Sequence, residues 1–244
     1  MTTTDIPKTD IPKTEPPMTM RGAQIDLSDL DLAAILCSRV CHDLIGPVAA
    51  VINGMELLEI EDDPAMAKEA VDLIGKSAKS ASAKLQFCRL AFGASGVPGG
   101  ELDTGEAEVA ARSMIDTERT KLKWEGAPRK VAKNAVKAML NLCLVAQSCV
   151  PRAGTVVVTL EGEGAAASFR VSAHGANPRL PPRVADLLLN RAEGAPVDAH
   201  VIHAYYAGCL ARSVGLHLAI VTAPDAITFA LDPGQAPILA EIQS

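Results

Sequence analysis

The sequence predicts a helical hairpin followed by a mixed α/β domain. Two long segments, 27–61 and 64–92, place apolar residues at alternating spacings of four and three. A glycine-rich run at 93–100 follows, and beyond it short stretches of β-branched residues alternate with helical patterns. Four-three spacing is typical of long helices that pack in bundles, and short β-branched stretches are typical of strands. The predicted fold class is therefore α plus α/β, divided at the glycine-rich run.

The first 22 residues predict a disordered tail. They repeat the motif TDIPKT, contain four prolines and carry almost no apolar bulk. Such a segment cannot offset the entropy of ordering by burying surface. We therefore assign 1–22 to a disordered tail outside the folded units.

One apolar stripe runs along the whole first helical segment. Its members are Leu30, Ala34, Cys37, Cys41, Leu44, Val48, Val51, Met55 and Leu58. Asp62 and Asp63 then precede Pro64, which predicts an N-cap and a proline in the first turn of a second helix. The stripe of that helix is Ala67, Val71, Ile74, Ala78, Ala81, Leu85, Cys88 and Phe92. Two helices joined by so short a turn form an antiparallel hairpin.

The hairpin, assigned to 23–95, has more apolar surface than one partner helix covers. Ile45 and Ile52 lie seven residues apart and widen the first stripe. A second copy of the hairpin would cover them, so we predict a homodimer that forms a four-helix bundle. Docking of the hairpin on its own C-terminal domain is the alternative.

The remainder of the chain, 101–244, predicts an α/β domain. Strands are expected at 155–160, 168–173, 216–222 and 226–231, and helices at 109–116, 131–150, 182–190 and 201–214. Strands and helices distributed in this way typically form a sheet covered by helices.

The composition excludes several classes of protein. The formal net charge is −6 and no run of Lys and Arg occurs, so a nucleic-acid binder is not expected. No apolar stretch approaches the ~20 residues of a membrane span, and the N-terminus lacks the apolar core of a secretory signal. We therefore expect a cytoplasmic protein that contacts neither nucleic acid nor membrane. The six cysteines fall in apolar helical patterns and are expected to be buried free thiols.

His42 is the residue of the hairpin that is best suited to chemistry. In heptad numbering Cys41 takes position a and Leu44 position d, so His42 falls at b and faces solvent. An imidazole in solvent presents a neutral ring nitrogen as a nucleophile near neutral pH. The neighbouring Asp43 carboxylate can hold the opposite ring nitrogen protonated and so orient the ring. Pro47 removes a helical hydrogen bond and bends the helix one turn beyond.

Six residues around His42 are expected to meet a partner protein. They are Arg39, Ile45 and Gly46 on the first helix, and Lys79, Ser82 and Gln86 on the second, which the pairing of the two stripes brings near. An ordinary solvated helix surface is the alternative for each of them.

The run His-Asp-Leu-Ile-Gly-Pro at 42–47 resembles the H-box of two-component histidine kinases. That motif has a histidine, an acidic residue, an aliphatic residue and a proline at the fifth place beyond the histidine. Here it also lies on the first helix of a predicted dimeric hairpin, which is its place in those kinases. Motif and structural context together are more specific than the motif alone.

The second domain resembles the kinase ATP-binding module (Bergerat type) in layout but lacks its nucleotide chemistry. Residues 141–146, Asn-Leu-Cys-Leu-Val-Ala, have Val145 where that module has a magnesium-binding asparagine. Magnesium requires oxygen ligands, which valine does not offer. Residues 173–177, Ala-His-Gly-Ala-Asn, have Ala173 in place of the adenine-recognising aspartate and Asn177 in place of a glycine. We therefore expect a degenerate ATPase-like α/β sandwich that does not bind ATP.

This combination resembles the ChpT family of bacterial histidine phosphotransferases over roughly 27–235. The resemblance implies a homodimeric protein phosphotransferase with His42 as the phosphoacceptor and Asp43 as the residue that orients it. It implies a multistep phosphorelay in cell-cycle signalling. Phosphate would pass from the receiver domain of a hybrid histidine kinase of the CckA type to response regulators of the CtrA and CpdR type. No cofactor or metal is expected on this chain, and Mg²⁺ would come with the partner receiver domain.

Three alternatives stay open on the sequence. An ATP-dependent histidine kinase with an atypical nucleotide site would phosphorylate His42 without another protein. A non-catalytic dimeric adaptor would bind partners without forming a phosphohistidine. A metal site would use His200 with His203, or Cys37 and Cys41 with His42, but neither set offers four converging ligands.

Overall fold

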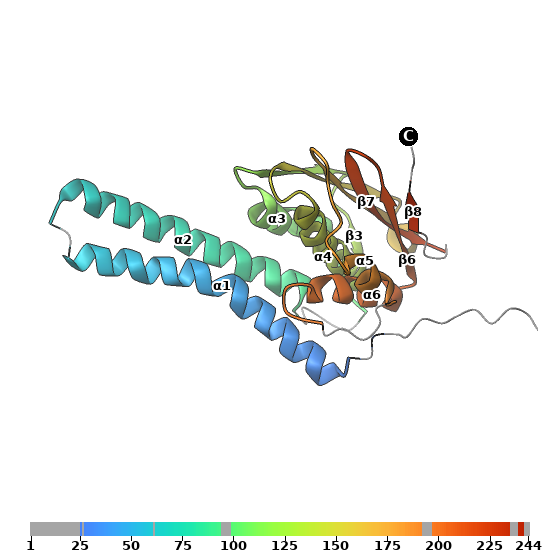
Figure 1. The fold of residues 1–244 in the computed structure, drawn as a ribbon. Coiled ribbons are helices and arrows are strands. Elements are labelled where there is room, and N and C mark those ends of the chain that lie inside the picture. Colours follow the sequence, from blue (N-terminus) through green and yellow to red (C-terminus); the bar gives the residue numbers. More distant parts are fainter. Residues whose placement is uncertain are drawn as a thin grey trace, which may run out of the picture.

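The structure, a computed structural model, describes residues 25, 27–60, 62–93, 99–191, 197–234 and 239–241. Two long antiparallel helices, α1 (Asp29–Ile60) and α2 (Pro64–Ala91), project from an α/β domain (Figure 1). The predicted hairpin and the mixed domain are therefore both present. The tail predicted for 1–22 lies outside the described residues.

Both helices of the hairpin have side-chain caps at their N-termini. The Asp63 carboxylate accepts a hydrogen bond from the Ala65 backbone N–H at 3.0 Å, and Pro64 occupies the first turn, as predicted. Ser28 Oγ accepts from the Asp31 backbone N–H at 3.1 Å and satisfies a free donor at the start of α1. Pro47 lies inside α1, which bends part way along its length (Figure 1).

The apolar stripe predicted along α1 divides between two faces of the helix. Gly54 is buried against α2, where an added Cβ would lie 2.6 Å from Ile74 Cγ1, and Leu44, Val51 and Leu58 are half-buried. The other part of the predicted stripe is exposed in the single chain. We use the name open stripe for four of these exposed members together with the two flanking isoleucines: Cys37, Cys41, Ile45, Val48, Ile52 and Met55. A single neighbouring helix covers one side of a broad stripe and leaves the other uncovered.

This division corrects the expectation for the cysteines. Cys88, Cys143 and Cys149 are buried free thiols, as predicted. Burial raises the pKa of the Cys143 thiol to about 12, so it stays protonated and unreactive. Cys37 and Cys41 are exposed, contrary to the prediction, because they lie on the open stripe.

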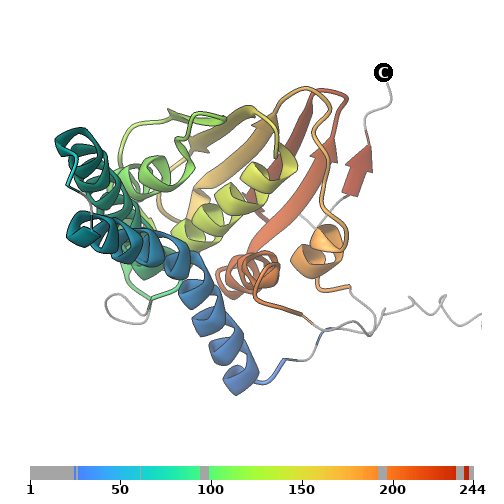
Figure 2. The ribbon, with the colours of Figure 1, turned by 60° about the vertical axis from the view of Figure 1, so that its left-hand side comes forward.

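The α/β domain consists of a sheet with helices on one face (Figure 2). Its helices are α3 (Thr104–Ile115), α4 (Lys133–Cys149), α5 (Val184–Leu189) and α6 (Ile202–Ser213), with a 3-10 turn at Gly164–Ala166. Its strands are β1 (Glu101–Asp103), β2 (Thr120–Glu125), β3 (Lys130–Ala132), β4 (Gly154–Glu161), β5 (Ser168–His174), β6 (Leu216–Thr222), β7 (Ala226–Pro233) and β8 (Leu239–Glu241). The main sheet has the order β2-β4-β5-β7-β6-β8, and β1 pairs with β3 separately.

The main sheet is mixed, with parallel and antiparallel neighbours. The pairs β2–β4 and β6–β8 are parallel, and the other pairs of the main sheet are antiparallel. Alternate residues such as Val156, Val158 and Phe169 point inward and are fully buried with Met139 of α4. The helices of the domain and the buried face of the sheet thus share one core.

The predicted helices and strands of this domain all occur, with ends shifted by a few residues. Strands β1, β2, β3 and β8 were not predicted from the sequence. In β2 the buried Thr120 and Leu122 alternate with the exposed Lys121 and Lys123. Half of this edge strand is charged and solvated, so its apolar signal is weak.

The base of the hairpin is built into the core of the α/β domain. Phe87, Leu90 and Ala91 of α2 are buried in the same cluster as residues of α3 and α4. The Asn141 side chain of α4, itself buried, donates to the Ala91 carbonyl at 3.2 Å, and Lys137 Nζ donates to the Gly93 carbonyl. These contacts hold the hairpin in a fixed direction, and α6 begins beside α1 (Figures 1 and 2).

Helix α1 is also long and apolar enough, by length and composition, to count as a candidate membrane span. The expectation that no stretch approaches such a composition is therefore wrong. One helix of this kind is weak support for a membrane protein, because helices that pack in soluble bundles pass the same test.

Candidate functional site

His42 stands on α1 with its side chain 58% exposed, as its heptad position predicts. It borders the open stripe, since Cys41 and Ile45 are its neighbours there, but it is not a member of it. The helix therefore presents the imidazole to solvent beside an apolar surface. A ring placed in this way is accessible to another protein.

The Asp43 carboxylate is held between two partners. Its Oδ1 lies 3.4 Å from His42 Nδ1, and its Oδ2 accepts a hydrogen bond from Arg39 Nε at 2.8 Å. The side chains of Asp43 and Arg39 are only 12% and 15% exposed, so the ion pair is largely shielded from water. With one oxygen fixed by Arg39, the other is directed at the histidine ring.

Pro47 explains a further contact at this site. Proline has no backbone N–H, so it cannot donate to the carbonyl four residues earlier, which is that of Asp43. Lys84 of α2 supplies the missing donor, because its Nζ lies 2.9 Å from the Asp43 carbonyl oxygen. The helix bend and the contact between α1 and α2 therefore arise together, next to His42.

The α/β domain also reaches the site. The rings of His42 and His200 meet edge to face, with centroids 4.8 Å apart and an interplanar angle of 80°. Arg39 Nη1 donates to the His200 carbonyl at 3.0 Å, so Arg39 connects Asp43 with the segment that carries His200. His200 lies just before α6, on the side where that helix meets α1.

His203, one turn further on, is buried behind this cluster. The pKa of His203 is lowered to about 3, mainly by burial and then by the Arg39 guanidinium, while the Asp43 carboxylate opposes this shift. Its Nδ1 has no hydrogen-bond partner within the described part of the chain. The imidazole is therefore neutral at physiological pH and acts as a packing residue.

This burial predicts a loss of stability in acid. Between the ordinary histidine pKa of about 6.5 and the native pKa of about 3, the unfolded chain binds a proton that the folded chain does not. The free energy of unfolding should fall as the pH falls through this window, by about 2 kcal/mol from His203 between pH 7.5 and pH 5. Urea unfolding of wild type and His203→Leu at both pH values measures the difference. His174→Leu, at an exposed position, is the control, and an equal pH effect in wild type and His203→Leu would contradict the assignment.

The six residues expected to meet a partner lie in different settings. Ile45 belongs to the open stripe and is 67% exposed, whereas Arg39 is occupied by Asp43 and His200. The other four are exposed: Gly46, Lys79, Ser82 and Gln86. The structure thus brings Arg39 together with His42 and Asp43.

Two residues of the site, Lys84 and His200, were not predicted from the sequence. Lys84 could have been predicted, because Pro47 leaves the Asp43 carbonyl without its helical donor and the facing helix can supply one. His200 had no local signal, because it lies far from His42 along the chain. It was considered only as a metal ligand with His203. Among the described residues, no group of three His, Cys, Asp or Glu side chains converges as a ligand set for a metal ion.

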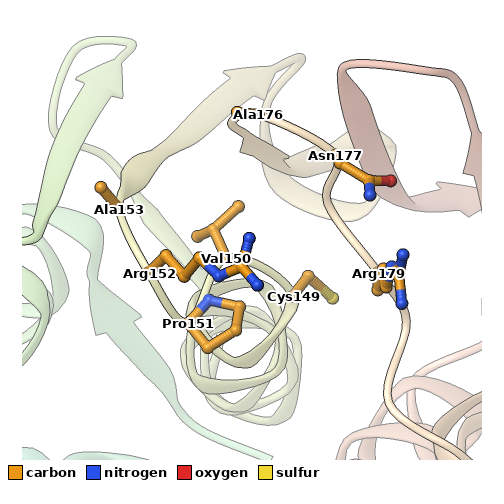
Figure 3. A pocket seen from close by; sticks show the side chains of 8 residues that line it. All are labelled: Cys149, Val150, Pro151, Arg152, Ala153, Ala176, Asn177 and Arg179. Atoms are coloured by element: carbon orange, nitrogen blue, oxygen red, sulfur yellow. The ribbon is translucent and has the colours of Figure 1, made fainter.

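The residues of α4 and β5 do not fit an ATP-magnesium complex. Val145 and Ala173 are completely buried and carry no oxygen in their side chains, and the Asn141 amide donates to the backbone at Ala91 and Lys137. A cavity of about 170 Å³ lies nearby, between the end of α4 and the loop after β5 (Figure 3). Its lining residues are Cys149, Val150, Pro151, Arg152, Ala153, Ala176, Asn177 and Arg179, none of which has a carboxylate to recognise adenine.

Comparison with known proteins relates the chain to phosphotransferases. The family model of the histidine phosphotransferase C-terminal domain matches residues 104–226. The chain is 40% identical over 208 residues to the protein phosphotransferase ChpT of Brucella abortus (strain 2308), covering 85% of this chain and 98% of that relative. A solved structure of a bacterial phosphotransferase has a TM-score of 0.78 at 40% identity, covering 86% of this chain and 99% of the other. The histidine kinase AdeS of Acinetobacter baumannii is a distant match, at 8% identity and a TM-score of 0.40 over 80% of this chain and 98% of the other.

Proposed function

This chain belongs to the histidine phosphotransferase family, and we propose that His42 is the residue that carries its phosphoryl group. Protein phosphotransfer within two-component signalling is the family activity, with response regulators among the partners. One observation carries the proposal: His42 is exposed to solvent while its Nδ1 faces the carboxylate of Asp43.

The geometry suits nucleophilic attack by Nε2. With Asp43 as acceptor, the proton of the ring stays on Nδ1, and the lone pair of Nε2 is free. When a phosphoaspartate approaches, the Nε2–P bond forms as the O–P bond to the aspartate breaks, and the carboxylate leaves. The positive charge that develops on the ring faces Asp43, whose second oxygen is held by Arg39. The reverse sequence delivers the phosphoryl group to the next aspartate.

The proposed donor is a receiver domain and not ATP. The support is the burial of Val145 and Ala173 and the use of Asn141 as an anchor for the hairpin. Phosphoryl transfer passes through a loose transition state in which positioning and a cation do most of the work. That cation, Mg²⁺, would come with the receiver domain. The proposed relay runs from a hybrid-kinase receiver to response regulators, of the cell-cycle type that the ChpT relationship suggests.

The proposed functional unit is a homodimer formed through the open stripe. Ile45, Val48, Ile52 and Met55 step by three and four along α1, and each is 47% exposed or more in the single chain. An apolar groove of about 450 Å³ between α1 and α2, lined in part by Cys37 and other apolar residues, extends the stripe toward the α/β domain. An isologous contact would bury this surface in a four-helix bundle.

We propose that the protein acts in the cytoplasm without a membrane span. The apolar residues of α1 lie on two faces. One face packs on α2, and the other, the open stripe, would pack on the second copy of the chain. Arg39, His42 and Asp43 interrupt the same helix with polar side chains. Charged groups in the middle of a span are costly.

The proposal is tested by offering the chain two phosphoryl donors, a phosphorylated receiver and ATP. Wild-type chain incubated with a radiolabelled phosphorylated receiver should take up label that is labile in acid and stable in alkali, as expected of a phosphohistidine. The same chain with radiolabelled ATP alone should take up none. A receiver whose phosphoacceptor aspartate is replaced by alanine is the control. Label acquired from ATP alone would favour a kinase, and receiver binding without label would favour an adaptor.

A further inference from the structure

We propose that His200 of the α/β domain is a positioning residue for phosphotransfer. Its ring, packed edge-on against His42, holds the imidazole with Nδ1 toward Asp43 and Nε2 toward the incoming phosphoryl group. The inference rests on the proposed role of His42. It makes the second domain a direct contributor to the site, through a residue outside the helical hairpin.

The contact geometry is that of a stable ring pair. A centroid separation of 4.8 Å and an interplanar angle of 80° describe an edge-to-face arrangement, which aromatic rings prefer over a face-to-face sandwich. Asp43 alone holds the ring weakly, because its Oδ1 lies 3.4 Å from His42 Nδ1, at the long end for a hydrogen bond. On an exposed helix face a ring with one weak contact rotates between orientations. The second contact, from His200, restricts that rotation.

His200 is itself held in place by its backbone. Its N–H donates to Asp198 Oδ1 at 2.8 Å, and the next residue, Val201, donates to the same oxygen at 3.3 Å. Its carbonyl accepts from Arg39 Nη1 at 3.0 Å, and the following Ile202 is completely buried at the start of α6. The His200 ring is exposed, but the segment that carries it is fixed on both sides.

Arg39 couples the two restraints on His42. The same guanidinium donates to the Asp43 carboxylate through Nε and to the His200 carbonyl through Nη1. The carboxylate and the second ring are therefore placed relative to each other by one side chain. The hydrogen bond from Asn141 of α4 to the end of α2 helps to hold the hairpin and the α/β domain in the relative position that the two contacts of Arg39 require.

Substitution of His200 separates ring packing from other roles. His200→Ala should slow phosphotransfer from a phosphorylated receiver by about 3- to 10-fold, the range that an edge-to-face ring pair contributes. His200→Phe keeps a ring without a nitrogen and should restore most of the rate. His174→Ala, at an exposed histidine of β5, is the matched control and should transfer at the wild-type rate. Circular dichroism of each variant checks that the fold is retained.

A second readout does not depend on phosphotransfer. Nitrogen-15 NMR of the unphosphorylated protein reports which ring nitrogen of His42 carries the proton. The Nδ1–H form should dominate in wild type and His200→Phe and fall in His200→Ala. An unchanged rate and tautomer in His200→Ala overturns the inference, and so does a His200→Phe variant as impaired as His200→Ala. If wild type takes up no label, the proposed function of His42 fails, whereas the NMR result still decides the contact with His200.

Discussion

Replacing His42 with alanine abolishes acceptance of a phosphoryl group from a receiver domain. Alanine has no nucleophile, and within the described residues His42 is the histidine paired with a carboxylate. We expect the rate of label uptake to fall by at least about 1000-fold, as in other cases where the attacking group itself is removed. The side chain is 58% exposed, so its loss should leave the fold and the oligomeric state unchanged.

The measurement is transfer of radiolabel from a phosphorylated receiver to the chain, resolved on a denaturing gel. His174→Ala is the matched control, because it removes an exposed histidine of the α/β domain and leaves the hairpin intact. Size-exclusion chromatography of both variants verifies assembly. Substantial label remaining on the His42→Ala chain would place the phosphoacceptor at another residue.

The double variant Ile45→Lys, Ile52→Lys converts the protein into a monomer that keeps its fold. Both side chains are more than half exposed in the single chain, so neither contributes to the hydrophobic core of one copy. In the proposed dimer four isoleucines per assembly would be buried, and each would bury the half or more of its side chain that is exposed in the single chain, a contribution of at least about 0.75 kcal/mol each. Their replacement by charges should therefore raise the dimer dissociation constant by at least about 100-fold.

Sedimentation analysis reports this change directly, since one chain has a mass of 25.5 kDa and the dimer twice that. The control variant Ala49→Lys, Asn53→Lys adds the same charge to exposed positions of α1 outside the open stripe. It should remain dimeric. A wild-type protein that sediments at 25.5 kDa, or a lysine variant that stays dimeric, would rule out the open stripe as the interface.

Local patterns were enough to predict the hairpin and most of the α/β elements. The four-three spacing located α1 and α2, and Asp63 with Pro64 marked the turn between them. Such signals are readable because each residue's contribution depends on neighbours within one or two turns. The edge strand β2 was not predicted, because half of its residues are charged and exposed to solvent. The small strands β1 and β3 offered only three residues each.

The residues of the candidate site likewise fall into those that the local sequence predicted and those that it did not. His42, Asp43 and Pro47 stand next to one another, and the exposure of His42 followed from its heptad position. The consequence of Pro47 for Lys84 required both helices, since the freed carbonyl of Asp43 finds its donor across the hairpin. The expectation that Cys41 is buried was wrong, because α2 covers only one side of the apolar stripe of α1.

The sequence by itself determined the hairpin and the exposed histidine with its adjacent carboxylate, and it places side chains without oxygen at Val145 and Ala173. Each depends on residue type and on spacing within a few turns of chain. Only the tertiary structure decided that His200 lies against His42. That contact depends on how α2 is anchored to α4 and on where α6 begins. Those positions result from the packing of many side chains from distant segments, and no short stretch of sequence encodes them.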